Sequence, residues 1–509
     1  MSITRGVASI RFRQPRNYHV ADRHYPRTCV TRPRYLHTVP LIINGKDITT
    51  EETFPVIGCL SGAEISQCST VSSQQVVDAV EAAQKAFPSW SATKPSERRD
   101  IFLKAADIFA KRREEMATYI YEEIGASKHY QDFIIGLAIE GLKDTAGRIA
   151  GAVTGEVPIS IHKDMRAMVL KRPYGVVLGI APWNAPYHLG LRSITFPIAT
   201  GNTAILKGPE FSPRCYWAFS DVFREAGLPD GVLNTLFHRP SDAAAVTEQL
   251  ISHPAIKKIN FTGSSKVGSI ISSSAGKHLK PVLMELGGKA NAIVLKDADL
   301  KNAAMQCTLG AFLNAGQICM STERILVHTS VANEFKKILQ QTVKQLFGTP
   351  ETTPVLVTAA SAERNRRLVD SALSQGAQPL YGNTELAGTL KTKMSPVVLT
   401  NIDENMDLYG TESFGPSVSL FTFETEEEAL ELANDTEYGL SASIYTEDLR
   451  AGFRVAEGIE SGAVHINSMT VHDEFALPHG GVKKSGFGRF NGYQGLEEFL
   501  YYKTVTWME

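Results

Sequence analysis

Three separate segments of the chain carry side chains that could act together on a carbonyl group: a cysteine, a glutamate and an asparagine. Cys319 lies in FLNAGQICMSTER, where Gly316 and the small residues Ala315 and Ser321 would let the backbone approach a ligand closely. A thiolate is a strong nucleophile, but a single cysteine is more often a buried and inert apolar side chain. Cys319 alone therefore indicates no function.

Glu285 and Asn184 each follow an apolar run that is typical of a buried strand. In PVLMELGGK, Gly287 and Gly288 predict a tight turn that brings the Glu285 carboxylate into a cleft. The alternative is a carboxylate that accepts from nearby backbone N–H groups. Asn184 could cap the next helix, or its amide could donate to the oxygen of a reacting carbonyl. A thiol with a base and an oxyanion donor would serve covalent chemistry at that carbonyl.

Two further segments have the composition of nucleotide-binding turns. The GxGxxG fingerprint does not occur intact, but FTGSSKVG follows an apolar strand and opens a predicted helix. It contains Gly263, Ser264 and Gly268, and a Gly-Ser turn at a helix N-terminus can hold a phosphate. Lys207 and Glu210 follow another predicted strand, in AILKGPE. A carboxylate there could accept from ribose hydroxyls and would repel a 2′-phosphate.

Short apolar runs separated by helix-length segments would position these side chains. A first series covers residues 176–180, 203–206, 232–236 and 259–261, and a second covers residues 292–295, 325–327, 418–421 and 463–466. Continuous apolar strands that alternate with helices are typical of a parallel sheet covered on both faces. The predicted fold class is therefore α/β, with two α/β domains in sequence.

The regions around these runs predict smaller elements. LIINGKDI predicts a hairpin with its turn at Asn44-Gly45, and amphipathic helices are predicted to start near Ser72 and at Ser96. Residues 499–507 are rich in Tyr, Thr and Val, which favours a strand. Such a strand would pair at a sheet edge, in this chain or in another subunit.

Residues 1–40 differ from the rest of the chain because they contain eight arginines, no lysine and one acid, Asp22. Ile3, Val7 and Ile10 fall at helical spacing, as in an Arg-rich mitochondrial transit peptide. The alternative is a disordered leader without a targeting role. A cytoplasmic or a mitochondrial location is therefore expected.

The composition excludes several classes of protein. The 509 residues are 43% hydrophobic with a formal net charge of -2, and no apolar stretch approaches the roughly 18 residues of a membrane helix. No basic face interleaved with aromatic residues indicates nucleic-acid binding. The six cysteines form no CxxC pair and no HExxH motif occurs, so neither a disulfide framework nor a metal site is expected. We expect a small-molecule substrate, without a nucleic-acid or membrane partner.

Seven motifs occur in one order over roughly residues 41–507: PWN, GNTAILKGPE, FTGSSKVG, ELGGK, GQIC, ESFGP and PHGGVKKSGFGR. This set resembles the aldehyde dehydrogenase superfamily. The resemblance implies that the Cys319 thiolate adds to an aldehyde and that Asn184 and the Cys319 N–H hold the oxyanion. Hydride then passes to a nicotinamide cofactor, and Glu285 activates the water that hydrolyses the thioester.

The resemblance also implies cofactor contacts. Lys207 and Glu210 would hold the adenosine ribose, Ser264 a phosphate and Glu412 the nicotinamide ribose, with Phe414 packed nearby. Gly263 and Gly268 would shape the phosphate turn. The cofactor would be NAD rather than NADP. The chain departs from the commonest family pattern at Gly208 and Ser413, and both changes spare the polar ligands.

The implied organisation divides the chain into four parts. A leader would cover residues 1–40, and a Rossmann-like NAD-binding domain would cover residues 41–286, with an oligomerisation hairpin near residues 150–172. A catalytic domain would cover residues 287–480, and a C-terminal segment with an oligomerisation strand would cover residues 481–509. The resemblance also implies a small β element for oligomerisation and a homodimer or homotetramer.

WNAPxxLGxR, QICMSTER and the His472-Asp473-Glu474 segment are similar to members that act on aromatic aldehydes. Tyr187 and Arg192 are the candidate substrate-pocket residues, since Arg192 lies about two helical turns after Asn184. The alternatives for Arg192 are a surface position or a salt bridge with an acid such as Glu474.

Two rival functions fit less well. An acylating dehydrogenase that passes the thioester to coenzyme A would lack Glu285. A catalytically inactive binding relative would lack Cys319 or Glu285, and both are present.

Overall fold

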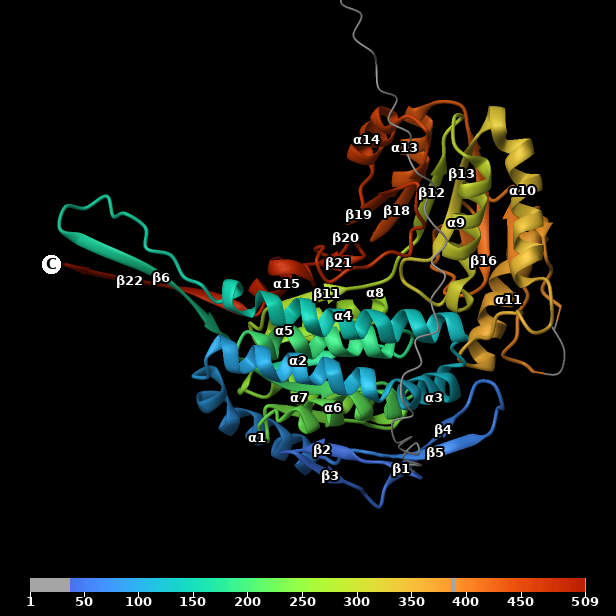
Figure 1. Ribbon diagram of the computed structural model, residues 1–509. Helices are drawn as coiled ribbons and strands as arrows, with labels where there is room; N and C mark the ends of the chain where they lie inside the picture. The colour runs from blue at the N-terminus through green and yellow to red at the C-terminus, as the bar shows by residue number, and fades with distance from the viewer. Residues whose placement is uncertain (1–36, 386–389, 509) are drawn as a thin grey trace, which may run out of the picture. The chain divides into compact units, whose positions relative to one another are not determined.

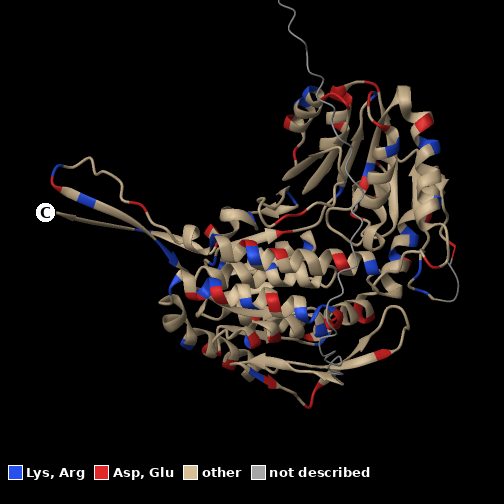
Figure 2. Cartoon of the chain, viewed as in Figure 1, with Lys and Arg blue, Asp and Glu red and all other residues tan. Residues whose placement is uncertain are grey.

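The computed structural model describes residues 37–385 and 390–508 (Figure 1). The predicted targeting segment within residues 1–40 lies outside the described residues, apart from the last few positions. No helix in the described part of the chain is both long and apolar enough to cross a membrane. Acidic and basic residues are interspersed along the helices (Figure 2).

The first main sheet has eight strands and holds a parallel, doubly wound centre. Its spatial order is β21 (Gly486–Phe487), β11 (Val282–Glu285), β10 (Ile256–Thr262), β7 (Val176–Ile180), β8 (Thr203–Lys207), β9 (Leu233–Leu236), β2 (Leu41–Ile43) and β3 (Lys46–Ile48). The strands from β11 to β9 are parallel, and β21 and β2 join the two edges in antiparallel fashion. The chain runs from β7 to β9 toward one edge and then crosses to β10 and β11.

Helices cover both faces of this sheet, as continuous apolar strands require. On one face, α5 and α6 pack on the strands, with α2, α3 and α4 packed against them, and α1, α7 and α8 cover the other face. Their bounds are α1 (Ser73–Ser91), α2 (Pro95–Lys111), α3 (Arg113–Ile124), α4 (Lys128–Ala152), α5 (Leu191–Ala199), α6 (Pro213–Ala226), α7 (Ala243–Ser252) and α8 (Ser265–Lys277).

The second main sheet has seven strands, which are parallel except for its edge strand β14. Its order is β14 (Gln378–Tyr381), β15 (Val397–Thr400), β16 (Ser417–Phe423), β13 (Thr322–His328), β12 (Ala290–Val294), β18 (Ser441–Tyr445) and β19 (Ala463–Ile466). Ala292 and Val294 pack in a core on one face of β12, while Ile293 packs in a core on the other. Both faces are therefore buried, which confirms the predicted α/β class for this half as well.

The remaining elements are helices and small sheets. The helices pack around the second sheet, apart from the last one, which contacts α4 and α5 beside the first sheet. The helices are α9 (Leu300–Phe312), α10 (Thr329–Phe347), α11 (Ala359–Ser374), α12 (Asp407–Gly410), α13 (Glu426–Asn434), α14 (Leu449–Gly458) and α15 (Gly492–Glu497). The small sheets join β1 (Thr38–Val39), β5 (Glu64–Ser69) and β4 (Thr53–Ile57), and separately β17 (Tyr438–Gly439) and β20 (Val482–Lys483).

A two-stranded ribbon extends away from the two main sheets (Figure 1). It pairs β6 (Met165–Pro173) with β22 (Leu500–Met508) in antiparallel register along their whole length. This confirms the strand that was predicted over residues 499–507. Its partner lies in the same chain.

The helix predicted near Ser72 begins as expected, because the Ser72 side chain accepts the N–H of Gln75. The next helix begins at Pro95 rather than at Ser96, so the prediction was wrong in detail. Proline suits the first helical position, and the Glu97 carboxylate accepts the N–H of Lys94 at 2.6 Å. These signals set the helix start.

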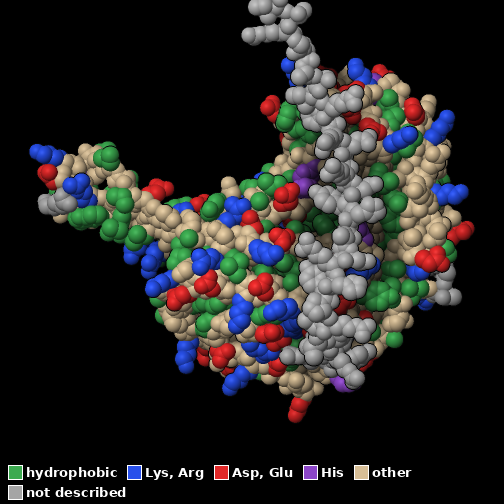
Figure 3. All heavy atoms as spheres, in the orientation of Figure 1, with side chains coloured by type: hydrophobic (Ala, Val, Ile, Leu, Met, Phe, Trp, Pro, Cys, Tyr) green, Lys and Arg blue, Asp and Glu red, His purple; other side chains and the backbone are tan. Residues whose placement is uncertain are grey.

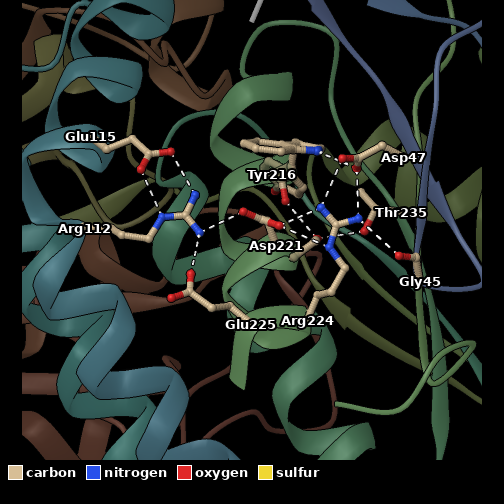
Figure 4. Close-up of polar contacts among 11 residues, drawn as sticks. Gly45, Asp47, Arg112, Glu115, Tyr216, Asp221, Arg224, Glu225 and Thr235 are labelled. Atoms are coloured by element: carbon tan, nitrogen blue, oxygen red, sulfur yellow. Dashed lines mark hydrogen bonds and ion pairs between the residues drawn. The ribbon is translucent and has the colours of Figure 1, made fainter. Parts of the chain in front are cut away.

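An arginine network holds α6 in place (Figure 4). Arg112, which follows α2, bonds Glu115 and Asp221, both at 2.8 Å. Arg224 bonds Asp221 at 2.6 Å and Asp47 of β3 at 3.1 Å. Asp221 and Arg224 both belong to α6. The network therefore ties this helix to α2 and to an edge strand of the first sheet.

Candidate active site

The candidate side chains converge where the chain changes direction in the first sheet. β7 and β10 are neighbours, and the chain leaves them toward opposite edges of the sheet. Ligands in such sheets bind beside the carboxyl ends of the strands at this switch point. Asn184 follows β7, Gly263 follows β10 and Glu285 ends β11, where it pairs with Thr262. Three strands thus deliver these residues to one place.

Cys319 reaches the same place through a left-handed turn that follows α9. Asn314, Ala315 and Gly316 have φ angles of 49°, 59° and 70°. Positive φ is unfavourable for alanine, so packing must hold this turn. A Cβ on Gly316 would lie 2.2 Å from the carbonyl oxygen of Gly415. The close approach at Gly316 is therefore to Gly415, which corrects the expectation that it serves a ligand.

The two glycines after Glu285 let neighbouring segments approach one another. A Cβ on Gly288 would lie 2.1 Å from the carbonyl oxygen of Cys319, and one on Gly287 would lie 2.6 Å from Oε2 of Glu412. A larger residue at either position would push these segments apart. The turn therefore brings the buried Glu285 carboxylate into contact with the Cys319 thiol.

Asn184 is fixed by hydrogen bonds on both its side chain and its backbone. Its Nδ2 donates to the carbonyl of Gln317 at 2.9 Å, and its own carbonyl accepts from the Tyr130 hydroxyl at 2.9 Å. The hydroxyl of Tyr216 on α6 donates to the carbonyl of Pro182 at 2.9 Å and supports the same loop. The side chain therefore does not cap a helix. An amide has two N–H hydrogens, so one remains for a ligand.

Cys319 lies between two cavities. The first cavity has a volume of about 390 Å³, and the second has a volume of about 30 Å³. The first is lined by residues that include Trp183, Gly263, Ser264, Glu285, Arg364, Glu412 and Phe414. The second is lined by residues that include Tyr130, Phe133, Ile134, Leu137, His188, Met320, Val471, Asp473 and His479. Cys319, Asn184 and Leu189 line both, so the thiol can be reached from two sides.

The environment favours the neutral form of the Cys319 thiol and the ionised form of the Glu285 carboxyl. Burial and the neighbouring Glu285 raise the pKa of Cys319 well above its ordinary value. Burial alone would raise the pKa of Glu285 too, but His479, Arg192 and the Cys319 thiol together lower it. At neutral pH the pair is therefore a neutral thiol beside a carboxylate. Glu285 can accept a proton from the thiol or from water.

The start of α8 fits a phosphate group. Ser264 is the N-cap of this helix, and its Oγ accepts the N–H of Val267 at 3.4 Å. Gly263 and Ser264 line the first cavity, so the positive end of the helix faces it. A Cβ on Gly268 would lie 2.5 Å from Cδ2 of Leu286. Gly268 therefore lets α8 pack closely on the segment that follows β11.

Glu412 and Phe414 line the same cavity. The Glu412 carboxylate accepts the N–H of Gly288 at 2.9 Å, and Arg364 donates to the Glu412 carbonyl at 2.9 Å. Burial raises the pKa of Glu412 to about 8. The Phe414 ring stands edge-on to Trp183, with centroids 6.1 Å apart. A planar ring and a hydroxyl-bearing sugar would therefore both find matching groups in the first cavity.

Lys207 is the last residue of β8, and Glu210 lies in the loop that follows. Burial lowers the pKa of Lys207 to about 8, although the Glu210 charge opposes this. Neither residue lines the first cavity, and Glu210 lines another cavity together with Phe211 and Pro240. Lys207 and Glu210 therefore do not share a cavity with Cys319.

The two departures from the common family pattern have local physical reasons. A Cβ on Gly208 would lie 2.4 Å from Cε1 of Phe237, so this position has no room for a side chain. The buried Ser413 hydroxyl donates to Glu323 at 2.9 Å, and the Ser413 N–H donates to the same carboxylate at 2.8 Å. Ser413 thus helps to fix the segment that carries Glu412.

Residues 47–505 match the sequence profile of the aldehyde dehydrogenase family over most of the chain. The chain belongs to the aldehyde dehydrogenase family. It is an oxidoreductase that acts on aldehydes with a nicotinamide cofactor, which confirms the predicted family, fold and reaction. The rival functions, an acylating dehydrogenase and an inactive relative, are not favoured.

Several members of the family are similar over nearly their whole length. Vanillin dehydrogenase of Pseudomonas sp. strain HR199 is 42% identical over 475 residues, which cover 92% of this chain and 97% of that protein. Salicylaldehyde dehydrogenase of Pseudomonas putida is 37% identical over 466 residues, which cover 90% and 95%. The crystal structure of a salicylaldehyde dehydrogenase from Pseudomonas putida G7 complexed with salicylaldehyde has a TM-score of 0.89 and 34% identity, covering 93% and 98%.

The two substrate-pocket candidates of this aldehyde dehydrogenase lie elsewhere than predicted. Tyr187 is fully buried, its hydroxyl donates to the carbonyl of Met116 at 2.8 Å, and it lines neither cavity. Arg192 is also fully buried and bonds Glu285 and Asp473. A π-helical turn over Pro186–Gly190 changes the phase of the helix, so Arg192 does not share a face with Asn184. The alternative of an internal salt bridge is therefore confirmed, although the acids are Glu285 and Asp473 and not Glu474.

Other residues of the site were missed because they become neighbours only in the folded dehydrogenase. Arg364 reaches the first cavity from α11, and Tyr130 and Phe133 reach the second from α4. His188 and His479 also line the second cavity. The only local signal was the charged segment around Asp473, and nothing in that segment indicates its partners.

Proposed function

We propose that this aldehyde dehydrogenase oxidises aromatic aldehydes with NAD, with Cys319 as nucleophile, Asn184 as oxyanion donor and Glu285 as base. The observation that carries the proposal is the position of Cys319 between two unlike cavities. The first offers the phosphate turn at Ser264 and the carboxyl of Glu412. The second is mostly apolar. A cofactor and an apolar aldehyde could thus approach the same sulfur from opposite sides.

The walls of the second cavity support an aromatic substrate. Tyr130 and Phe133 contribute rings whose centroids are 6.4 Å apart, and Ile134 and Leu137 extend the same wall of α4. Such walls suit a planar apolar ring. The similarity to vanillin and salicylaldehyde dehydrogenases supports the same class.

One edge of the second cavity is polar. His188, Asp473 and His479 line it, and Nε2 of His188 lies 2.6 Å from Oδ2 of Asp473. Imidazole nitrogens can donate to or accept from a phenolic hydroxyl. We therefore expect ring hydroxyls to be tolerated or preferred, and we assign this contact to the two histidines instead of Arg192.

The first half of the reaction forms a covalent adduct. Glu285 takes the proton of the Cys319 thiol and passes it to solvent, so the carboxylate is ionised again, and the thiolate attacks the aldehyde carbon. The amide N–H of Asn184 and the backbone N–H of Cys319 donate to the resulting oxyanion. When bound in the first cavity, the nicotinamide ring supplies the acceptor for the hydride that leaves this carbon. Cys319 is then left as a thioester.

The second half releases the acid. A water molecule attacks the thioester carbon while Glu285 accepts one of its protons, and the C–S bond breaks as the thiolate leaves. A thioester reacts slowly with unactivated water, so the carboxylate controls this step. The lowered pKa of Glu285 keeps it ionised and ready as a base at neutral pH.

Glu412 should make NAD binding depend on pH. With a pKa of about 8 the free carboxyl is mostly protonated at neutral pH, whereas accepting from ribose hydroxyls requires the ionised form. Affinity for NAD should therefore rise with pH by up to about tenfold per unit until the pKa is passed. Glu412→Gln should remove this rise in a calorimetric titration. Lys207 titrates in the same range but is present in both proteins, so the comparison isolates Glu412. A wild-type Kd that is constant from about pH 6.5 to about pH 8.5 would contradict this role.

Glu210 should select NAD over NADP. A carboxylate that accepts from the adenosine ribose repels a 2′-phosphate. Glu210→Gln should therefore raise kcat/KM for NADP relative to NAD about tenfold, which corresponds to about 1.4 kcal/mol. Steady-state rates with both cofactors and one aldehyde measure this ratio. An unchanged ratio would remove Glu210 from cofactor selection.

The β6–β22 ribbon supports a homodimer or homotetramer. Val157, Ile159 and Ile161 before β6 are 82%, 99% and 95% exposed, and hydrophobic side chains gather on this ribbon in Figure 3. A lone two-stranded ribbon is marginally stable in water and leaves edges unpaired. A second copy of the chain would cover it. Light scattering should give the mass of a dimer or tetramer, and Ile159→Asp with Ile161→Asp should lower it. A monomeric wild type at micromolar concentration would contradict the proposal.

A substrate panel tests the proposed function as a whole. Purified protein should form NADH fastest with benzaldehyde, salicylaldehyde or vanillin, compared with acetaldehyde and hexanal, when each is run with NAD and with NADP. If a short aliphatic aldehyde has the highest kcat/KM, the aromatic assignment fails. If NADP gives the higher kcat/KM throughout, the NAD assignment fails.

A further inference from the structure

A buried cluster of charged side chains contacts Glu285. Arg192 is its centre: Nη2 donates to Oε2 of Glu285 at 3.1 Å, and Nη1 donates to Oδ2 of Asp473 at 3.2 Å. Its side chain is fully buried and lines neither cavity, so it cannot contact a substrate in either one. Burying an arginine has a large desolvation cost, which its pairing with two carboxylates only partly offsets. Such a residue is therefore a candidate for a functional role.

The cluster has further contacts that hold Arg192 in one orientation. The guanidinium stacks on the Phe490 ring, with Cζ 4.3 Å from the centroid. Asp473 is itself fixed, because Nδ2 of Asn491 donates to its Oδ1 at 2.6 Å and His188 bonds its Oδ2 at 2.6 Å. Arg192 therefore cannot swing away from Glu285 without breaking several contacts.

The two oxygens of Glu285 consequently differ. Oε2 accepts from Arg192, whereas Oε1 is buried and has no hydrogen-bond partner among the described residues. Nε2 of His479 lies 3.9 Å from Oε1, too far for a hydrogen bond. Glu285 also lines the first cavity beside Cys319. One oxygen is thus anchored and the other is free to accept a proton.

We propose that Arg192 is a positioning residue that anchors Oε2 of Glu285, so that Oε1 is the oxygen that accepts the proton of the hydrolytic water. This inference rests on the proposed role of Glu285 as the base of thioester hydrolysis. In that step water forms a C–O bond to the acyl carbon, its proton passes to Oε1, and the C–S bond breaks with the electron pair on sulfur. Arg192 contacts neither water nor acyl group.

The test uses 4-nitrophenyl acetate, which acylates a thiol without an aldehyde or a cofactor. The Cys319 thiolate displaces 4-nitrophenolate and leaves acetyl-Cys319, and water then releases acetate. The release of 4-nitrophenolate measures acylation. After rapid removal of excess ester, the loss of the acetyl group followed by intact mass measures deacylation separately.

Arg192→Met should leave acylation within about threefold of the wild type and slow deacylation on the order of 100-fold, since misplacing a reacting group by about 1 Å can have such an effect. Glu285→Gln should slow deacylation at least as much, and it should slow acylation too, because the carboxylate that accepts the thiol proton is then absent. Arg192→Lys should deacylate at an intermediate rate, because a single ammonium cannot bridge two carboxylates as a guanidinium does. If Arg192→Met does not fold, the Arg192→Lys deacylation rate decides.

Arg214→Met is the matched control. Arg214 is also a buried arginine, which bonds Glu122 at 2.6 Å and Glu123 at 3.4 Å and stacks on Tyr119 at 5.2 Å, but it lines neither cavity. It should lose stability without any change in the ratio of deacylation to acylation. A purely structural Arg192 would behave like this control.

The possible failures are distinguishable. Wild-type deacylation in Arg192→Met, or an equal loss of acylation and deacylation, overturns the inference alone. Wild-type deacylation in Glu285→Gln overturns both the base and the anchoring role. A wild-type enzyme that turns over the ester but forms no NADH from aromatic aldehydes overturns the proposed substrate and leaves the result for Arg192 standing.

Discussion

Replacing Cys319 with alanine should abolish NADH formation from every aldehyde, with a loss on the order of 10⁴-fold or more in kcat. The reason is that, among the described residues, no other cysteine lines either active-site cavity. Cys215 and Cys307 are fully buried in the cores of the two α/β units, and neither lines the two cavities beside the active site. Without the sulfur no covalent adduct forms, so hydride has no carbon from which to leave.

The fold and the cofactor site should survive this change. Cys319 is only partly exposed and packs at the border of the first core, so removing its sulfur leaves the surrounding strands in place. Circular dichroism and NAD titration should match the wild type, while spectrophotometry at the NADH band shows no product. Cys307→Ala is the matched control and should keep full turnover. Appreciable turnover by Cys319→Ala would overturn the mechanism.

Replacing Glu285 with glutamine should have the second largest effect. Steady-state turnover should fall by about 10²- to 10³-fold, because a positioned general base contributes about this much. Hydride transfer precedes the hydrolysis that Glu285 promotes. A stopped-flow trace should therefore show a burst of NADH that approaches one equivalent per active site, followed by the slow phase.

The glutamine keeps the size of the side chain and can still accept from Arg192, so the site should keep its shape. Cys319→Ala, which should give neither a burst nor a slow phase, is the comparison that separates the two steps. Loss of the burst in Glu285→Gln, in step with the steady-state rate, would mean that the carboxylate acts chiefly on the thiol. In that case hydrolysis would need another base.

The sequence predicted those parts of the fold that depend on local pattern. Runs such as Val176 to Ile180 are apolar at every position, and only a strand covered on both faces buries them all, so the α/β class followed directly. The Ser72 cap and the strand over residues 499–507 could also be predicted, because a helix cap and a strand-forming composition are both local features of the sequence. The order of the seven motifs was sufficient to identify the family. It also singled out Cys319, Glu285 and Asn184, whose proximity the structure then provided.

Only the tertiary structure decided which groups meet. Arg192 was expected in the substrate pocket from its spacing after Asn184, but the π-helical turn and the partners Glu285 and Asp473 bury it behind the base. Contacts between residues so far apart in the chain leave no periodic trace in sequence, because they depend on how strands, helices and loops pack in three dimensions. The sequence by itself thus determined which reactive residues the protein has. The packing determined that Oε1 of Glu285, and not Oε2, is free to accept a proton.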